Sequence, residues 1–214
     1  MRSQIVLASA SPRRRELLSL VLKDFLVETS SVDESGFLVD ASAVSVERAA
    51  LAKARDVAGR SAEGSVIIAA DTVISFRNRL LGKPENEEHA EVILKELRGE
   101  VHAVITAVAI LASAGSREYL FHESTSVRMN DYTDTDIREY IATGEPMDKA
   151  GAYAIQGLGS KLVHSIKGCY PNVVGFPLCA VVRHLNLAGV ETGPVPGICP
   201  GRAATDDLQL TIDN

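Results

Sequence analysis

Apolar positions in the first part of the chain alternate between strand-like and helix-like spacing. Residues 4–8 form a short apolar run typical of a buried strand, and Ser11-Pro12 favours the start of a helix that we expect to end near residue 22. Residues 43–58 repeat apolar side chains at helical spacing. The chain is therefore predicted to open with a strand, a tight turn and a helix, followed by a second amphipathic helix.

A long apolar segment at residues 66–76 is rich in β-branched residues and is predicted to be a strand. Arg77-Asn78 after it indicates a hairpin turn that returns through Leu80 and Leu81. The remaining predicted elements are a helix at 86–99, strands at 101–112 and 118–129 joined by a loop at 113–116, a helix at 133–144, a Gly-rich loop at 150–160, a strand at 161–166 and a helix at 176–187. Together they predict an α/β fold with a mixed sheet.

The composition fits one globular domain. The chain has 214 residues, of which 46% are hydrophobic and 23% charged, and a chain of this size can bury a core without a metal or disulfide staple. We expect the domain at residues 1–188, folded as two lobes around a central cleft. The Gly- and Pro-containing segment 189–214 is predicted to be a tail without chemistry.

Charge and hydropathy exclude two classes of partner. The formal net charge is −6, whereas a nucleic-acid polymer is bound through a basic surface. No apolar stretch approaches the roughly 18 residues of a membrane span, and the three cysteines match no metal-ligand or redox spacing. We therefore expect a cytoplasmic protein that binds neither a nucleic-acid polymer nor a membrane.

Asp71 is the strongest catalytic candidate, because it interrupts the apolar strand at 66–76. A carboxylate in such a strand is costly to bury unless it is paired or binds a metal ion. The alternative is a structural aspartate that accepts backbone hydrogen bonds at a bulge. Lys53 lies on the apolar stripe of the helix at 43–58 and is the second candidate, although a lysine can also extend along its helix to water.

Three arginines, Arg13 to Arg15, follow Ser9 and Ser11 at the start of the first predicted helix. A helix N-terminus presents unpaired N–H groups, so these groups, the hydroxyls and the guanidinium forks together predict a site for phosphate oxygens. The alternative is a solvated basic turn that is partly offset by Glu16.

Glu34 is the acid that we expect near Asp71, and Lys83, in Gly82-Lys83-Pro84, is placed to reach the same cleft. Carboxylates without His or Cys clusters favour Mg²⁺ or Mn²⁺ over zinc. The sequence has neither the P-loop motif nor the dinucleotide-binding glycine motif. The standard P-loop and dinucleotide-binding phosphate cradles are therefore absent.

Five segments together resemble a known family. They are Leu7-Ala-Ser-Ala-Ser-Pro-Arg-Arg-Arg-Glu-Leu-Leu18, Ala70-Asp-Thr-Val73, Gly82-Lys-Pro84, Gly144-Glu-Pro-Met-Asp-Lys-Ala-Gly-Ala-Tyr-Ala-Ile-Gln-Gly157 and Asn172-Val-Val-Gly-Phe-Pro177. In this order they resemble the Maf family of nucleotide pyrophosphatases, also called septum formation inhibitor proteins. The resemblance spans residues 4–188, and the combination is far more specific than any one motif.

The resemblance implies an elongated mixed β-sheet flanked by helices, related to inosine-triphosphate pyrophosphatases, and a homodimer. It implies that Asp71 is the proton acceptor and that Arg13, Thr72 and Gln156 set the base preference. The other cleft positions that match are Ser9, Arg14 and Lys149 as substrate-binding residues, Lys53 and Lys83 as catalytic cations, and Glu34 as a metal ligand beside Asp71.

The segments around Asp71-Thr72 and Gln156 resemble the branch of the family that acts on dTTP and UTP, whereas a sister branch acts on 7-methyl-GTP. Two departures concern the shape of the base pocket rather than the catalytic residue. Ala154 stands where a glycine is more usual, and Cys169-Tyr170-Pro171 replaces a more polar turn.

We therefore expect a metal-dependent hydrolase that splits dTTP or UTP into the monophosphate and pyrophosphate. Asp71 would deprotonate a water that attacks the α-phosphorus, while Lys53, Lys83 and Arg14 neutralise charge on the leaving group. The alternatives are a pyrophosphatase for 7-methyl-GTP or another modified nucleotide, and a regulator of cell division that binds nucleotide without turnover.

Overall fold

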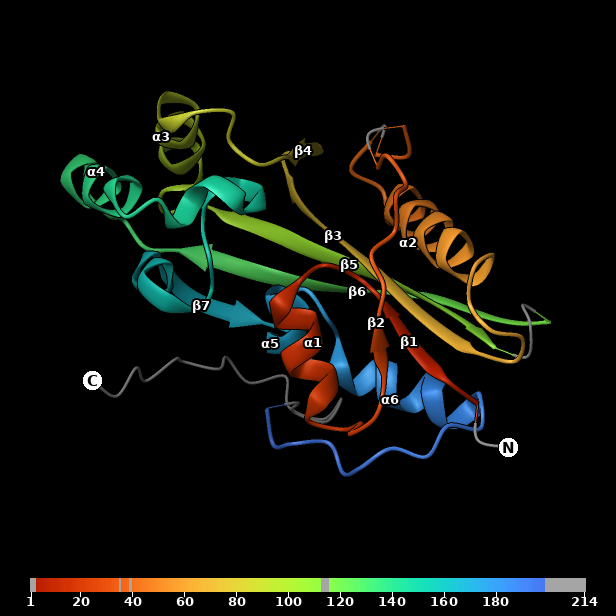
Figure 1. The fold of residues 1–214 in the computed structure, drawn as a ribbon. Helices are drawn as coiled ribbons and strands as arrows, with labels where there is room; N and C mark the ends of the chain where they lie inside the picture. The colour runs from red at the N-terminus through yellow and green to blue at the C-terminus, as the bar shows by residue number, and fades with distance from the viewer. Residues whose placement is uncertain (1–2, 35, 39, 113–115, 199–214) are drawn as a thin grey trace.

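A computed structural model describes residues 3–34, 36–38, 40–112 and 116–198, which form a seven-stranded mixed sheet with helices on both faces (Figure 1). The strands are β1 Ile5–Ala8, β2 Leu26–Val27, β3 Val66–Phe76, β4 Arg79–Leu81, β5 Val101–Ala112, β6 Arg117–Met129 and β7 Val163–Lys167. Their order is β2-β1-β3-β5-β6-β7, and β4 pairs with β3 outside this path. β1 is parallel to both of its neighbours and the remaining pairs are antiparallel, which confirms the predicted mixed α/β fold.

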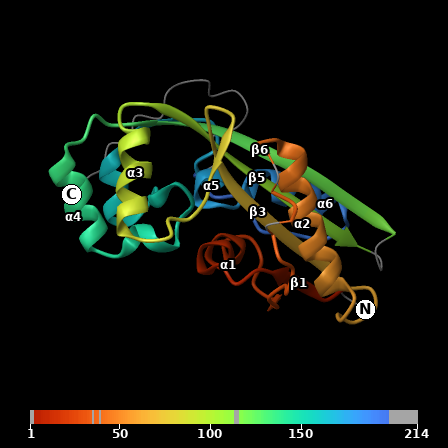
Figure 2. The ribbon, with the colours of Figure 1, turned by 90° about the horizontal axis from the view of Figure 1, so that it is seen from above.

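The helices cover the sheet unevenly. They are α1 Pro12–Ser19, α2 Ala43–Ala58, α3 Glu87–Leu97, α4 Asp134–Ala142, α5 Tyr170–Val174 and α6 Leu178–Leu187, with 3₁₀ helices η1 Glu145–Asp148, η2 Ala150–Ala152 and η3 Gly157–Leu162. Figure 1 and Figure 2 show α2 over one end of the long strands, α6 on the opposite face, and α3 with α4 at the other end. No helix among the described residues is long and apolar enough to cross a membrane.

Alternating side chains along β3 divide the core into two clusters. Ile67 and Ala69 pack with Val46 and other buried residues of α2. Ile68 and Ile74 point to the other face and belong to the larger cluster, which includes the buried leucines of α3 and α6. β3 is therefore apolar on both faces, so the polar pair in its middle needs a specific environment.

Most predicted elements lie where the sequence places them. Arg77 and Asn78 have positive φ angles of 50° and 60°, as a two-residue hairpin turn requires, and the helix after Thr133 has its capping box. α1 ends earlier than expected, at Ser19. The sequence does not predict β2 or α5, because elements of 2 and 5 residues are too short to show a hydrophobic period.

The first residues of the predicted tail pack on the domain. The Gly193 N–H donates to the Val21 carbonyl over 2.8 Å, and the segment 189–198 follows the outside of the molecule (Figure 1). Residues 199–214 and most of the predicted loop 113–116 lie outside the described residues. The two cysteines among the described residues differ in state: Cys179 is disulfide-bonded, whereas Cys169 is a free thiol.

β3 has a gap on one side. β1 pairs with it up to Ala69, and β4 pairs with it from Ile74 onward. Over residues 70–73 no described strand pairs with this side of β3, while its other side stays paired with β5. The gap places Asp71 and Thr72 at an opening in the middle of an otherwise continuous sheet.

Candidate active site

A cleft of about 740 Å³ lies at the gap in β3. It is lined on one side by the segment 8–16 around the start of α1, together with Thr29, Ser30 and Glu34, and on the other side by Lys83 and the segment 148–156. All ten residues that the sequence singles out line this one cleft: Ser9, Arg13, Arg14, Glu34, Lys53, Asp71, Thr72, Lys83, Lys149 and Gln156. They come from seven separate parts of the chain, so the fold brings together what the motifs leave apart.

Lys53 joins two carboxylates at the centre of the cleft. Its Nζ lies 2.6 Å from Asp71 Oδ1 and 2.5 Å from Glu34 Oε1. Lys53 and Asp71 are 7% and 3% exposed, whereas the Glu34 side chain is 47% exposed. Lys53 is therefore no surface lysine: the packing of α2 against β3 turns its side chain toward the strand and seals the ion pair with Asp71 away from water.

The two acids have opposite pKa shifts. Burial raises the pKa of Asp71, and the charge and hydrogen bond of Lys53 only partly oppose this effect. Burial would also raise the pKa of Glu34, but the hydrogen bond and charge of Lys53 lower it overall. Asp71 Oδ2 is buried and has no hydrogen-bond partner among the described residues. Asp71 thus combines raised basicity with an oxygen that is free to take a proton or a ligand.

Arg14 fills the gap in β3. Its Nη1 donates to the Ala70 carbonyl over 2.7 Å, its Nε to the Gly175 carbonyl over 2.9 Å, and its Nη2 to Thr72 Oγ1 over 3.0 Å. Nη1 also lies 3.4 Å from Ser9 Oγ. Burial lowers the pKa of Arg14, while the charges of Asp71 and Glu34 oppose this shift. Of the five N–H groups of a guanidinium, one on Nη2 is left to face a ligand.

The two hydroxyls beside Arg14 differ in what they offer. Thr72 Oγ1 accepts from Arg14 and lies 3.0 Å from Thr106 Oγ1, which itself donates to the Asn172 carbonyl. The Thr72 hydroxyl proton is therefore held within the protein, because Thr106 Oγ1 and, over 3.4 Å, the Gly175 carbonyl can both accept it. Ser9 Oγ accepts from the Ser11 N–H and from Arg14, and its proton has no acceptor among the described residues. Ser9 is the hydroxyl that can donate to a phosphate oxygen.

Cations at the rim complete the cleft. Arg13 lies at the start of α1, Lys83 follows β4, and Lys149 lies between η1 and η2 and pairs with Asp148. The cleft lining holds five cationic side chains, Arg13, Arg14, Lys53, Lys83 and Lys149, against four acidic ones, Glu16, Glu34, Asp71 and Asp148, whereas the whole chain carries a net charge of −6. This local excess of cationic groups suits a polyanionic ligand.

Sequence reasoning misses one group in the wall of the cleft. Tyr153 lines the cleft, and its Oη lies 2.7 Å from Nε2 of His102, a buried residue of β5. Burial lowers the pKa of His102 to about 4 and raises that of Tyr153, so both are neutral at physiological pH. Tyr153 stands in the Ala-Gly-Ala-Tyr segment, but nothing in the sequence connects it with a histidine 51 residues away.

The oxygen-rich centre fits a hard divalent cation better than zinc. Among the residues that the structure describes, no group of three His, Cys, Asp or Glu side chains could hold a metal ion. Two carboxylates, Glu34 and Asp71, meet at the floor of the cleft, and the buried Asp71 Oδ2 has no hydrogen-bond partner among the described residues. Mg²⁺ commonly binds one or two carboxylates and completes its shell with substrate phosphates and water.

Comparison with known proteins gives the family. Residues 4–188 match the family described as Maf-like protein. A dTTP/UTP pyrophosphatase of Halalkalibacterium halodurans is 45% identical over 188 residues, 88% of this chain and 97% of that protein. One from Clostridium beijerinckii is 46% identical over 176 residues, 82% of this chain and 94% of that protein.

A solved structure of a HAM1 protein from Coxiella burnetii is 15% identical, with a TM-score of 0.47 over 87% of this chain and 100% of that one. The family match spans nearly all of the described residues, and both relatives cover more than four fifths of the chain. The chain belongs to the Maf-like protein family.

Proposed function

We propose that this protein is a nucleoside triphosphate pyrophosphatase that hydrolyses dTTP and UTP to the monophosphate and pyrophosphate. The observation that carries the proposal is the buried Asp71 carboxylate in a cleft that holds five cationic side chains: one of its oxygens is held by Lys53, and the other has no hydrogen-bond partner in the part of the chain that the structure describes. The relatives named as dTTP/UTP pyrophosphatases support the substrate, because they are about 45% identical over almost their whole length.

Asp71 acts as the proton acceptor. A water molecule in the cleft attacks the α-phosphorus, the new bond forms between the water oxygen and that phosphorus, and the α–β bridging bond breaks. The water proton passes to the Asp71 carboxylate, and the electron pair of the broken bond leaves with pyrophosphate. The raised pKa of Asp71 makes it a better base than an exposed carboxylate.

The cations bind and stabilise the triphosphate. Lys83 and Lys149 on one wall and Arg13 on the other surround the space above Asp71 and offset charge on the leaving pyrophosphate. Ser9 donates its hydroxyl proton to a phosphate oxygen. Arg14 contributes mainly by holding the Ala70 carbonyl and the Thr72 hydroxyl in place, with one N–H left for substrate.

Gln156 at the far wall reads the base. Its amide both donates and accepts, so it can match the edge of a pyrimidine. Arg13 and Thr72 also line the cleft and contribute to the base preference, Thr72 through its fixed side chain rather than through a free proton.

Glu34 and Asp71 are the residues that would hold Mg²⁺ or Mn²⁺. The bound ion would add positive charge beside the phosphate oxygens and lower the electrostatic cost of bringing a triphosphate to two carboxylates. Lys53, which already bridges these acids, keeps them together while the site is being filled.

The test is pyrophosphate release from dTTP, UTP, CTP, GTP and 7-methyl-GTP, with Mg²⁺, with Mn²⁺ and with chelator. Metal-dependent release that favours dTTP and UTP is the expected result. Pyrophosphate release mainly from 7-methyl-GTP would contradict the assignment of dTTP and UTP as substrates. Nucleotide binding without pyrophosphate release from any of the five would contradict the enzymatic function and favour a regulatory one.

Two expectations about the cell carry over as proposals. The protein acts in the cytoplasm, where nucleoside triphosphates are found, and it forms a homodimer. Light scattering after size-exclusion chromatography measures the mass of the protein in solution. A measured mass equal to that of one chain would contradict the homodimer.

A further inference from the structure

The segment 153–159 lines the cleft through its residues 153–156 and carries Gln156 at its centre. Gln156 itself is exposed and makes no side-chain cap to the 3₁₀ helix η3 that begins after it. Its position is therefore set by whatever holds the backbone on either side of it.

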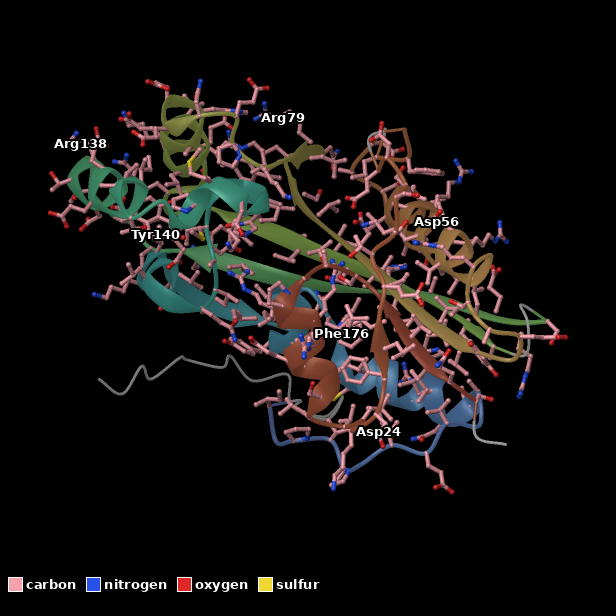
Figure 3. The ribbon with its side chains drawn as sticks, viewed as in Figure 1. Asp24, Asp56, Arg79, Arg138, Tyr140 and Phe176 are labelled. Carbon is pink, nitrogen blue, oxygen red and sulfur yellow. The ribbon has the colours of Figure 1, made fainter. Side chains whose placement is uncertain are left out.

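Two side chains from outside the segment hold that backbone. The Ala154 N–H donates to Tyr140 Oη over 3.1 Å on one side of Gln156. On the other side, the Leu158 and Gly159 N–H groups donate to the Glu145 carboxylate over 3.2 Å and 3.0 Å. Tyr140 is a buried residue of α4, and Figure 3 shows it at the end of the molecule formed by α3 and α4.

Tyr140 and Glu145 also bind each other. The Tyr140 hydroxyl donates to Glu145 Oε1 over 3.0 Å, which leaves its oxygen to accept from the Ala154 N–H. Burial raises the pKa of Tyr140, so the hydroxyl keeps the proton that this arrangement requires. One phenol and one carboxylate thus satisfy three backbone N–H groups within six residues, and neither side chain lines the cleft.

Two glycines allow this close approach. A Cβ on Gly157 would lie 2.9 Å from Glu145 Oε2, and the residue has a φ of +73°. A Cβ on Gly159 would lie 2.4 Å from Tyr140 Oη and 2.6 Å from the Ala154 carbonyl oxygen. The backbone of the segment is therefore shaped around these two side chains, and an ordinary residue at either position would push it away.

We propose that Tyr140 and Glu145 form a clamp that positions Gln156 and thereby sets the base preference of the enzyme. This inference rests on the proposed function, because it names the residues that position a base-reading side chain. The two residues touch neither substrate nor reacting atoms, so they are positioning residues.

The clamp predicts a specific kinetic signature. Uracil presents an acceptor at O4 and a donor at N3, whereas cytosine presents the reverse pattern, so discrimination requires an amide held in one place. Loosening the segment spreads Gln156 over several positions without moving Asp71 or Lys53. The KM for UTP should therefore rise and the preference for UTP over CTP should fall by about tenfold, with kcat changed much less.

The experiment compares Tyr140→Phe and Glu145→Gln with Tyr132→Phe. Tyr132 is a matched control, since it is also buried, belongs to the same end of the molecule and donates its hydroxyl to a backbone carbonyl, that of Leu94, over 2.7 Å. Among the described residues, the Tyr132 hydroxyl makes no hydrogen bond to the segment 153–159. Kinetic constants for UTP and CTP are measured with each protein, and thermal melting shows whether each is folded.

Loss of the UTP preference in both clamp variants, with its retention in Tyr132→Phe, supports the clamp. Retained preference in folded Tyr140→Phe and Glu145→Gln proteins overturns it, and so does an equal loss in Tyr132→Phe, which would point to general loosening. Calorimetric binding of UTP and CTP to the same variants in an Asp71→Asn background does not depend on turnover. Failure of the wild type to release pyrophosphate therefore counts against the proposed function, while equal relative affinities in all variants count against the clamp.

Discussion

Lys53 reaches Asp71 from α2, with 2.6 Å between Nζ and Oδ1, and leaves the second carboxylate oxygen without a partner among the described residues. Burial raises the pKa of this aspartate, and Lys53 is the largest influence that lowers it. The pair thus keeps a buried carboxylate ionisable and directs its free oxygen to the cleft. A structural aspartate at a bulge would instead accept backbone hydrogen bonds, and Asp71 accepts none in the described part of the chain.

Replacing Asp71 by Asn should remove catalysis while sparing the fold. The amide is nearly the same size but cannot accept the proton of the attacking water, so kcat should fall by about 10³-fold or more. Pyrophosphate release under saturating UTP and metal measures the effect. Asp134→Asn is the control, because Asp134 is an exposed acid of α4 that pairs with Arg98. A fully active Asp71→Asn protein would remove the proposed role.

Replacing Lys53 by Met should move the acidic limb of the pH–rate profile to higher pH. Asp71 must be deprotonated to accept a proton, so activity rises with pH through its pKa in the folded protein. Lys53 lowers that pKa, so without Lys53 the pKa of Asp71 rises further. The profile of kcat/KM against pH measures the shift.

Lys95→Met is the control for this profile, because Lys95 is an exposed residue of α3 that pairs with Glu91. It should leave the acidic limb in place. An unchanged limb in the Lys53→Met protein would mean that a group other than Asp71 limits the rate in acid.

Replacing Glu34 by Gln should raise the metal requirement. A neutral amide oxygen is a weaker ligand for a hard cation, so the Mg²⁺ concentration for half-maximal activity should rise about tenfold. Titration of activity with MgCl₂ measures this concentration. Glu139→Gln, on the exposed side of α4, should behave like the wild type. Identical titrations for Glu34→Gln and wild type would exclude Glu34 as a ligand.

The sequence singles out Asp71 and Lys53 as buried charged residues that need partners, because the signals are local. Asp71 interrupts an apolar strand, and Lys53 interrupts the apolar stripe of a helix. The hydrophobic pattern therefore predicts that both side chains are buried, and a buried charge requires a partner. That they are partners of each other follows only from the packing of α2 over β3.

The role of Arg14 is not readable from the sequence. Beside two other arginines at a helix start it resembles a phosphate ligand, but its acceptors, the Ala70 and Gly175 carbonyls, are 56 and 161 residues away. Arg14 is needed there because β1 and β4 pair with the same side of β3 but stop short of each other, which leaves a gap between them. Strand ends set by pairing partners are among the features that a hydrophobic pattern does not contain.

Replacing Arg14 by Lys should therefore destabilise the protein as well as inactivate it. A single ammonium cannot reach the Ala70 carbonyl, the Gly175 carbonyl and the Thr72 hydroxyl together, so buried acceptors lose their donors at a cost of about 2–4 kcal/mol. Urea unfolding measures the loss. Arg15→Lys, at the neighbouring exposed position, should change stability by less than about 0.5 kcal/mol. Equal stability of the two variants would mean that Arg14 does not support the gap.

Protonation of His102 should weaken the fold in mild acid. Its pKa is about 4 in the folded protein, below the ordinary histidine value of 6.5, because burial disfavours the charged ring. The unfolded chain then binds the proton first as pH falls, so the stability that neutral His102 provides is complete above pH 6.5 and is lost progressively down to about 4. The full loss is about 3 kcal/mol.

Urea unfolding of the wild type and of His102→Gln at several pH values isolates this contribution. Glutamine does not titrate, and its amide can still pair with the Tyr153 hydroxyl that His102 Nε2 meets at 2.7 Å. As the pH falls through this range, the free energy of unfolding of the wild type should decrease relative to that of His102→Gln. Above pH 6.5 the difference between the two proteins reflects packing alone. Parallel stability curves across the whole range would show that His102 keeps its ordinary pKa, and that the Tyr153 wall of the cleft is open to water.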